Sequence, residues 1–376
     1  MSDLLVKLKP RNRDAITEYH GSIFINLTLI TNIEIPIQDI ALLHDPPNSA
    51  KGLTFVGTMT HTEAEDKLDH PSSSFLHAVF HLLNGTFMAK IRSVEFIHVN
   101  LEDFVPFFKA LATSDFCPIK VKIRECWGLS SGRDFFISER VKQLLFDGIF
   151  PYTTENRDLD LFACTRVYKK LELRLSNPSV AVLFGSLSYA LTNNQGARFL
   201  IVTTDYEDEP GLEEEWLRLS RSLAHNDKVQ KLYFAPPIIS REIFRTIIAS
   251  LMTMPTITSV ILEERSKIMK MVLREEDVAL LLDLLRSPIN RIVTFSLPVT
   301  LLPSNDIHMK IQHELRLNYA GRIALRSFSE PPVIDSLWPT ILARVGSRKV
   351  RKLKRKVHRL SAMFFLLSSK PDLVQR

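Results

Sequence analysis

The part of this sequence that most resembles a catalytic motif is a serine between two glycines. The run Gly128-Leu129-Ser130-Ser131-Gly132 matches G-x-S-x-G, in which a serine nucleophile sits on a tight turn between a strand and a helix, and a predicted strand over residues 120–125 precedes it. Histidines that could act as its base follow at His225, His308 and His313. The next predicted helix begins only near Ser138, so Ser130 would lie within a loop. We therefore predict that the chain is not an enzyme and retain a serine esterase as a remote alternative.

The residues that could bind a metal ion or a nucleotide lack the spacing that such sites need. In the polar stretch 58–74 the potential ligands are His61, Glu63, Glu65, Asp69 and His70. Their spacing matches no metal motif, and a solvated acidic loop explains them. His77 and His81 are four residues apart on a predicted helix, as in H-E-x-x-H, but Ala78 occupies the position of the glutamate. Since the sequence also has no glycine-rich phosphate-binding loop, it predicts neither a metal nor a cofactor.

Composition and cysteine content predict a soluble protein of a reducing compartment. The 376 residues are 45% hydrophobic and 24% charged, and no apolar run approaches the roughly 18 residues that a membrane span needs. The three cysteines, Cys117, Cys126 and Cys164, form no C-x-x-C pair and no metal-binding pattern. The first residues mix charges with apolar side chains, unlike a secretory signal. We expect a cytoplasmic or nuclear protein without a membrane partner.

The net charge of +6 comes from one segment. Nine Lys and Arg residues lie between Arg344 and Arg359 with no acidic residue among them, whereas the remainder is close to neutral and slightly acidic. The densest part comprises Arg348, Lys349, Arg351, Lys352, Lys354, Arg355 and Lys356. Such a segment is typical of a nuclear-localisation signal or a phosphate-binding patch, and equally of a solvated loop, so nucleic acid is a candidate partner. It has no interleaved aromatic side chains, so base stacking is not expected.

The strongest pattern in the sequence is a strand–helix cycle of about thirty residues, which is clearest between Val229 and Phe295. Strands are predicted there over 229–234, 257–262 and 289–295, and helices over 212–223, 240–252, 274–285 and 304–318. Each strand has an apolar residue, two spacers and then apolar-x-apolar. The central apolar position recurs about once per cycle, with a single long step from Val121 to Leu171; its members are Val94, Val121, Leu171, Leu200, Leu232, Val260 and Ile292.

This cycle is typical of a leucine-rich-repeat solenoid, an α/β horseshoe with parallel strands on the concave face and helices on the convex face. We predict an array over residues 75–300 and, over 1–74, an irregular N-terminal part with early repeats and a polar insertion loop. Residues 301–376 are expected to form a helical C-terminal cap. The long step from Val121 to Leu171 holds a predicted helix over 137–146 and a loop-like stretch over 150–166, which indicates one enlarged repeat or one with a degenerate strand.

The spacing over residues 75–300 resembles the ribonuclease-inhibitor-like class of leucine-rich repeats. The terminal pattern is also similar to the C-terminal segment of uncharacterised repeat proteins found in diatoms. It runs from Leu315-Arg316-Leu317-Asn318-Tyr319-Ala320-Gly321-Arg322 through Trp338, Ile341 and Leu342 to Phe364-Phe365-Leu366-Leu367 and Lys370-Pro371-Asp372-Leu373. The asparagine that many such repeats place after the strand is not in a consistent phase here. The resemblance implies a repeat fold and a general role in binding partners, and it implies no catalytic residues.

In such a fold the side chains between the apolar strand positions point outward. On this basis the predicted surface comprises Lys120, Lys122, Arg124, Lys170 and Arg174 on the earlier strands and Ile201, Tyr233, Ile261 and Val293 on the later ones. A surface that is basic toward one end and apolar toward the other suits a protein partner with acidic and apolar parts. The alternative is a solvated face without a partner, because charges on open strands also prevent edge pairing. We expect a non-enzymatic protein–protein interaction scaffold, with a nuclear or nucleic-acid-associated role through the basic segment as the alternative.

Overall fold

The computed structural model describes residues 16–19, 22–26, 52–57, 92–99, 101–105, 108, 120–126, 141–148, 167–175, 180–204, 211–264, 271–287 and 289–320. They belong to an α/β chain of two compact units. The first unit consists of Met1–Ala190 and Gln195–Glu209, and the second of Leu191–Asn194 and Pro210–Arg376.

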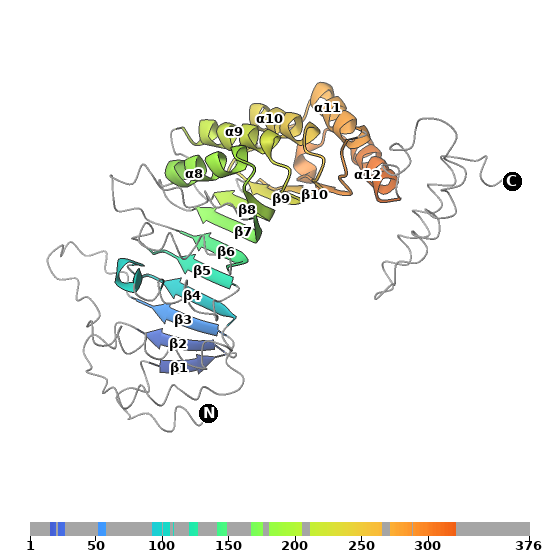
Figure 1. Ribbon diagram of the computed structural model, residues 1–376. Helices are drawn as coiled ribbons and strands as arrows, with labels where there is room; N and C mark the ends of the chain where they lie inside the picture. Colours follow the sequence, from blue (N-terminus) through green and yellow to red (C-terminus); the bar gives the residue numbers. More distant parts are fainter. Residues whose placement is uncertain are drawn as a thin grey trace, which may run out of the picture. The chain divides into compact units, whose positions relative to one another are not determined.

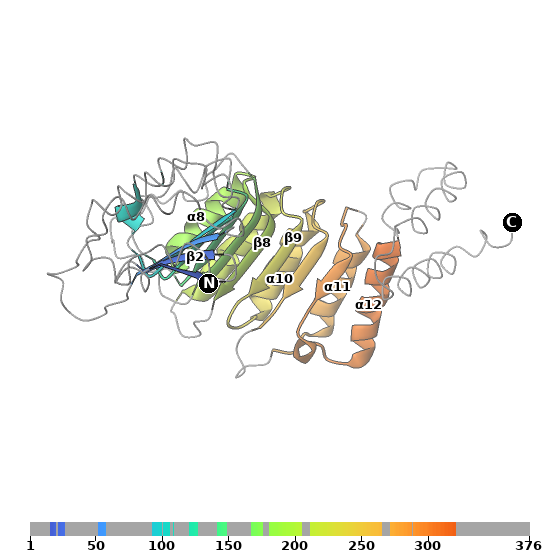
Figure 2. The same cartoon turned by 90° about the horizontal axis from the view of Figure 1, so that it is seen from below.

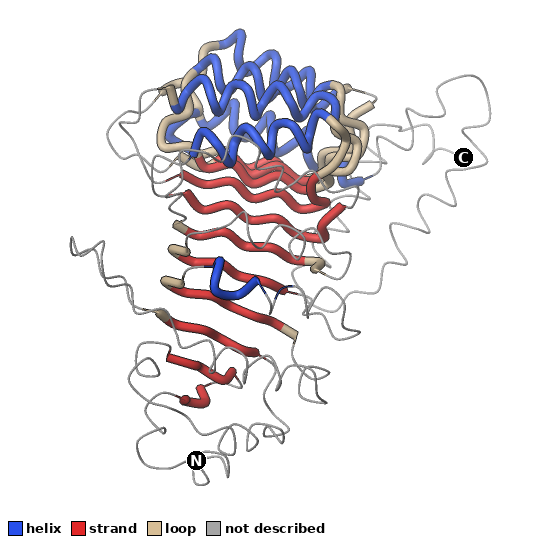
Figure 3. The backbone as a smooth tube through the Cα atoms, turned by 60° about the vertical axis from the view of Figure 1, so that its left-hand side comes forward, coloured by secondary structure: helices blue, strands red, loops and turns tan. Residues whose placement is uncertain are grey.

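The first unit is built on a sheet whose strands lie side by side in chain order, drawn as arrows in Figure 1 and in red in Figure 3. They are β1 (Ile16–Tyr19), β2 (Ser22–Asn26), β3 (Gly52–Val56), β4 (Ser93–Ile97), β5 (Lys120–Arg124), β6 (Gln143–Asp147), β7 (Val167–Leu175) and β8 (Gly196–Thr204). β1 is antiparallel to β2, and each later strand is parallel to the one before it. The helix α8 (Val180–Thr192) lies between β7 and β8 in the chain. Parallel neighbours in chain order are the arrangement of a solenoid-like α/β fold.

Alternation of apolar and polar residues gives these strands two different faces. In β5, Val121 and Ile123 are fully buried, whereas the basic residues on either side of them are partly exposed. β4 repeats the pattern with Val94 and Phe96. Because successive side chains of a strand point to opposite faces, one face belongs to the core and the other lies at the surface.

A cluster of phenylalanines forms the core beside β3 and β4. Phe55 and Phe96 stack with their ring centroids 5.4 Å apart. Phe104, in the short helix η2 (Leu101–Phe104), meets these two rings edge-on at 5.1 and 5.2 Å, and Phe108 lies 5.5 Å from Phe96. All four rings are at most 2% exposed. The core therefore lies on the side of the sheet against which η2 packs.

The residue that follows each of β4, β5 and β6 by one position has a left-handed backbone conformation. His98, Glu125 and Gly148 have φ values of 53°, 49° and 60°, in the left-handed region. Each donates its backbone N–H to a carbonyl of the next strand, at 3.1, 2.7 and 2.8 Å. Gly57 holds the same position after β3 and donates to Ile97 at 2.8 Å. These bonds extend the ladder by one residue.

We expect Gly57→Ala to lower the free energy of unfolding by about 2 kcal/mol. A Cβ at this position would lie 2.1 Å from the carbonyl oxygen of His98, a backbone atom that cannot rotate away. At Gly211 a Cβ would meet nothing within 4 Å, but the φ of +86° makes Gly211→Ala cost about 1 kcal/mol. Urea unfolding of the two variants separates the steric cost from the conformational one. A Gly57→Ala protein as stable as the parent would contradict the close approach.

The second unit alternates helices with parallel strands (Figure 2). Its elements are α9 (Leu212–Ser222), η4 (Leu223–His225), β9 (Lys231–Ala235), α10 (Arg241–Met252), β10 (Ser259–Leu262), α11 (Glu275–Arg286), β11 (Thr294–Ser296), η5 (Val299–Leu301) and α12 (Asn305–Ala320). β10 is parallel to both β9 and β11, and each helix from α9 to α12 contacts the next. Successive cycles therefore stack strand against strand and helix against helix.

Buried asparagines join the cycles of the second unit. Asn226 and Asn290 each follow a helix and are at most 2% exposed. Each donates Nδ2 to a carbonyl near the end of the preceding cycle's helix, Leu191 or Leu251. Each also accepts a backbone N–H from two or three residues later. Asn318 bonds the end of α11 in the same way, so these buried backbone groups are satisfied across the cycle boundary.

The structure confirms the helices predicted in the second unit and several of the predicted strands. The four predicted helices are α9, α10, α11 and α12, and the strands predicted over 120–125, 229–234 and 257–262 are β5, β9 and β10. The parallel sheet also begins well before residue 75, because β2 pairs with β3 and β3 pairs with β4. The described strands β1, β2 and β3 therefore lie within the predicted N-terminal part, residues 1–74. Among the described helices, none has the length and apolar character needed to cross a membrane.

One predicted helix is wrong. Residues 143–147, inside and just beyond the helix predicted over 137–146, form β6, and Leu144 pairs with Val121 and Leu171. The long step is therefore two cycles, one from Val121 to Leu144 and one from Leu144 to Leu171. Short apolar runs have no periodicity that separates a buried strand from a buried helix segment, and the consecutive apolar residues of β6 are such a run.

Several predicted features lie outside the described residues. They are the stretch 58–74, His77 and His81, Cys117, the Ser130 pentapeptide, Cys164, the part of the C-terminal cap beyond residue 320 and the basic segment 344–359.

Candidate functional site

The side chains of β4 to β8 that point away from the core form a surface that we call the sheet face. The parallel register aligns them in rows across the strands. The middle row is Glu95, Lys122, Leu145, Glu172 and Ile201. To either side, β5 adds Lys120 and Arg124, β6 adds Gln143 and Asp147, and β7 adds Lys170 and Arg174. The structure thus brings together all five basic residues singled out in the sequence, with Ile201 in the same row as Lys122.

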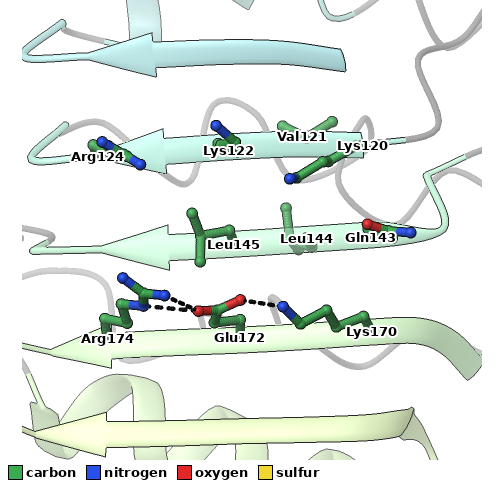
Figure 4. A pocket seen from close by; sticks show the side chains of 10 residues that line it. All are labelled: Lys120, Val121, Lys122, Arg124, Gln143, Leu144, Leu145, Lys170, Glu172 and Arg174. Atoms are coloured by element: carbon green, nitrogen blue, oxygen red, sulfur yellow. Dashed lines mark hydrogen bonds and ion pairs between the residues drawn. The ribbon is translucent and has the colours of Figure 1, made fainter. Parts of the chain in front are cut away.

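A hollow of about 270 Å³ lies on the sheet face over β6 (Figure 4). Leu145 is at its centre, with Lys122 on one side and Glu172 on the other, as the register requires. Leu145 is short and only 8% exposed, whereas the polar side chains around it are long. This difference in length produces the hollow. Its rim is completed by Lys120, Gln143 and Lys170 at one end and Arg124 and Arg174 at the other.

Glu95 on β4 binds two of the cations on β5. Its Oε2 lies 2.8 Å from Nζ of Lys122, and its Oε1 lies 3.0 Å from Nε of Arg124. Asp147 is a weaker partner, 3.9 Å from the same Nε. The Glu95 side chain is 16% exposed and that of Arg124 is 41% exposed. Glu95 is thus within ion-pair distance of both cations, although Nε of Arg124 forms no hydrogen bond with a described residue.

Glu172 holds the two cations of its own strand. Its carboxylate accepts hydrogen bonds from Nζ of Lys170 at 2.6 Å and from Nε of Arg174 at 2.7 Å. Burial alone would raise the pKa of Glu172, but these hydrogen bonds and positive charges outweigh it, so the pKa lies below its ordinary value. The Glu172 carboxylate, 8% exposed, is therefore ionised at neutral pH.

Lys120 is the cation of the hollow without an ion-pair partner among the described residues. Its pKa is lowered by partial burial first and then by the positive charges of Lys122 and Lys170, against the smaller opposing effects of Glu95 and Glu172. Partial burial and two neighbouring cations therefore both disfavour the charged form of Lys120.

In the second unit, the predicted apolar residues Tyr233 and Ile261 lie on neighbouring strands, β9 and β10. These residues pair in register and are both partly exposed, and the hydroxyl of Tyr233 donates to Glu263. The prediction for Val293 is wrong, because Ile261 pairs with Ser296. Ser296, not Val293, occupies the position next to Ile261 on this surface.

The misplacement of Val293 has a local cause. Ile289, Ile292 and Phe295 are apolar at a spacing of three, so the strand pattern fits the sequence in two registers. Ile289 is 55% exposed, whereas Ile292 and Phe295 are buried, and Phe295 pairs with Val260. The correct alignment therefore begins three residues later than predicted.

Sequence reasoning missed the acidic and central residues of the sheet face. Glu95 and Glu172 are spacers between apolar strand positions, so the rule that selected Lys122 would also have selected them. Leu145 and Asp147 could not be placed without recognising β6 as a strand. Because of these omissions, the predicted face was basic, whereas the observed one interleaves both charges.

Two observations concern the chemistry of the described residues. These residues contain no group of three or more His, Cys, Asp or Glu residues that could hold a metal ion. Cys126 is fully buried after β5, and burial raises the pKa of its thiol to about 12, so it stays protonated at neutral pH. The sheet face can hold an anionic group by ion pairs next to an apolar side chain.

No protein-family model matches the chain, and a search of curated proteins gives no match.

Proposed function

We propose that this chain is a protein-interaction scaffold of the leucine-rich-repeat type, which binds a protein partner on its sheet face and performs no catalysis. The observation that carries the proposal is the order of that face. Five cations, three carboxylates and a central leucine stand in rows around a hollow, fixed by the parallel register. Rigid strands hold side chains in the constant positions that recognition of another protein surface requires.

The length of the cycle supports a leucine-rich repeat. The register aligns Val94, Val121, Leu144, Leu171 and Leu200 as buried equivalents. Leucine-rich repeats are about 20 to 29 residues long, with one strand in each repeat, and every interval in this series falls within that range. This series is more regular than the series of apolar positions predicted from the sequence. The long step in the predicted series arose because strand β6 was not predicted.

The dimensions of the hollow favour a macromolecular partner over a small ligand. Pockets for small molecules and cofactors are roughly 300 to 1,000 Å³ and bury most of the ligand. A hollow of about 270 Å³ on the surface of a sheet can receive one side chain of a larger molecule. The polar residues around a leucine also fit the usual anatomy of a protein interface, in which a polar rim surrounds an apolar centre.

The two other functions considered from the sequence gain no support. The basic segment 344–359 and Ser130 both lie outside the described residues, so no contact or geometry favours a nucleic-acid-associated role or an esterase.

We expect a partner that co-purifies with the full chain to be lost when Lys120→Glu and Arg124→Glu are combined. Charge reversal at two rim positions would repel acidic groups of the partner and reduce recovery by about tenfold or more. The matched control is Lys169→Glu with Arg198→Glu, which reverses two exposed cations on β7 and β8 that do not line the hollow. Quantitative mass spectrometry of the purified complexes measures recovery, and thermal unfolding shows that both variants fold. Identical partner lists for the parent and both variants would contradict binding at the sheet face.

A further inference from the structure

We propose that the hollow is an anion subsite, which takes a carboxylate or phosphate group carried by an extended segment of the protein partner. The inference rests on the proposed function and names the chemical group that the sheet face recognises. The central part of the sheet face would then be a specific binding site for a negatively charged group.

The charge balance of the hollow leaves room for an additional anion. Its lining includes five cations and a single carboxylate, that of Glu172. Glu95 supplies a second carboxylate from β4, which is shared between Lys122 and Arg124. Lys120 has no ion-pair partner among the described residues, and its pKa is lowered first by partial burial and then by repulsion from Lys122 and Lys170. An anion beside Lys120 would relieve this repulsion.

The donors on the rim are placed to share such an anion. Arg124 approaches Glu95 and Asp147 most closely through Nε, and a guanidinium has five N–H donors. Arg174, with a side chain 47% exposed, stands at the same end of the hollow on β7. Lys120 is at the other end, on β5, as Figure 4 shows. An anionic side chain that enters the hollow therefore meets cations at either end of it.

The central leucine favours an extended peptide as the carrier of the anion. In an extended segment, side chains alternate in direction, so residues two apart point to the same side. A segment laid over the face can thus place an apolar residue on Leu145 and an acidic residue beside Lys120. The existing ion pairs of Glu95 and Glu172 hold the surrounding cations in place before binding, which lowers the cost of ordering them.

A nucleic-acid strand fits the same surface less well. Glu95, Asp147 and Glu172 are interleaved with the cations and would repel a continuous phosphate backbone. None of the described residues that line the hollow is aromatic, and the neighbouring Phe199 ring already lies against Nζ of Lys170, 5.6 Å from the ring centroid. A single anionic group flanked by uncharged residues avoids the three carboxylates.

The test measures binding of fluorescein-labelled peptides to the full chain by fluorescence anisotropy at low ionic strength. One peptide alternates glutamate with leucine, a second has glutamine in place of glutamate, and a third has phosphoserine there. We expect the two anionic peptides to bind and the glutamine peptide to bind at least about tenfold more weakly. The tighter of the two anionic peptides identifies the group as carboxylate or phosphate.

Two neutralising variants make the test specific to the hollow. Lys120→Gln keeps much of the length of the side chain and breaks no ion pair among the described residues, and we expect it to weaken the anionic peptides by about tenfold. Lys169→Gln removes an exposed charge on β7 away from the hollow and should change binding by less than about twofold. Equal effects of the two variants, or equal binding of the anionic and glutamine peptides, would overturn the inference. So would a single-stranded DNA probe that binds more tightly than either peptide and depends on Lys120.

The peptide experiment and the purification experiment can each refute one proposal without refuting the other. If the peptides show no preference for anions while the partner is still lost on charge reversal at Lys120 and Arg124, the anion subsite is refuted and the proposed function stands. If the partner list is insensitive to the reversal, the proposed function is refuted. Lys120-dependent binding of the anionic peptides would then still establish the subsite.

Discussion

Replacing Phe96 by alanine is expected to lower the free energy of unfolding by about 4 kcal/mol. The ring is fully buried and lies 5.2 to 5.5 Å, between centroids, from Phe55, Phe104 and Phe108. Its removal would leave a cavity in the cluster that joins β3, β4 and η2. The remaining rings would lose both apolar contact and edge-to-face packing. Urea unfolding followed by circular dichroism measures the loss.

Two further variants separate burial from general damage to the strand. Ile97 is the next residue of β4, is partly exposed and faces the opposite side, so Ile97→Ala should cost only about 1 kcal/mol. Phe96→Leu retains most of the apolar volume and should cost about 1.5 kcal/mol. If Phe96→Ala were no more harmful than Ile97→Ala, the assignment of the two faces of β4 would be wrong.

The sequence was sufficient to predict the alternation of elements in the second unit. There the helices α9 to α11 have clear apolar faces, and β9 and β10 follow the apolar-x-x-apolar-x-apolar pattern. Helical periodicity of 3.6 and strand periodicity of 2 differ enough to be separated when both occur in one cycle. The predicted boundaries therefore fall within a few residues of the observed ones.

Prediction failed where local sequence allows two solutions. In β6 the consecutive apolar residues Leu144, Leu145 and Phe146 suit a buried strand and a buried helix alike. Its strand character is decided by pairing with β5 and β7, which are distant in sequence. At β11 the apolar spacing of three permitted a shifted register, and only the pairing of Phe295 with Val260 resolves it.

The charge of the candidate site was mispredicted for a different reason. Lys122 and Arg124 were recognised one strand at a time, as a basic group. Their partner Glu95 lies one cycle before them, on the neighbouring strand, and the three are brought together only by the parallel register. A repeat fold places residues one cycle apart in direct contact, so the charge of its surface is a property of adjacent cycles and not of one strand.

In the second unit, a buried carboxylate of one helix forms ion pairs with arginines of the preceding helix. Asp277, in the first turn of α11, is fully buried, yet two arginines of α10 reach it, Arg241 Nε at 3.0 Å and Arg245 Nε at 2.6 Å. It also accepts the backbone N–H of Arg274, the residue that caps the helix, at 3.0 Å. Burial alone would raise the pKa of Asp277, but the hydrogen bonds from Arg245 and Arg274 and the arginine charges lower it below its ordinary value.

We expect Asp277→Ala to lower the free energy of unfolding by about 3 kcal/mol at neutral pH. Asp277→Asn should lower it by about 2 kcal/mol, since an asparagine side chain can still accept the backbone N–H at the start of α11.

The effect of Asp277 should depend on pH. Because the folded pKa of Asp277 is depressed, its ionised carboxylate stabilises the protein above the unfolded pKa of about 4 and ceases to do so as the pH falls through the folded pKa. The difference between the parent and Asp277→Asn should therefore be constant from neutral pH to about 4 and shrink below it. Urea unfolding across this range measures it, with Asp283→Asn, an exposed position of α11, expected to stay within about 0.5 kcal/mol of the parent. A difference that persists undiminished in strong acid would show that the charge of Asp277 does not hold α10 to α11.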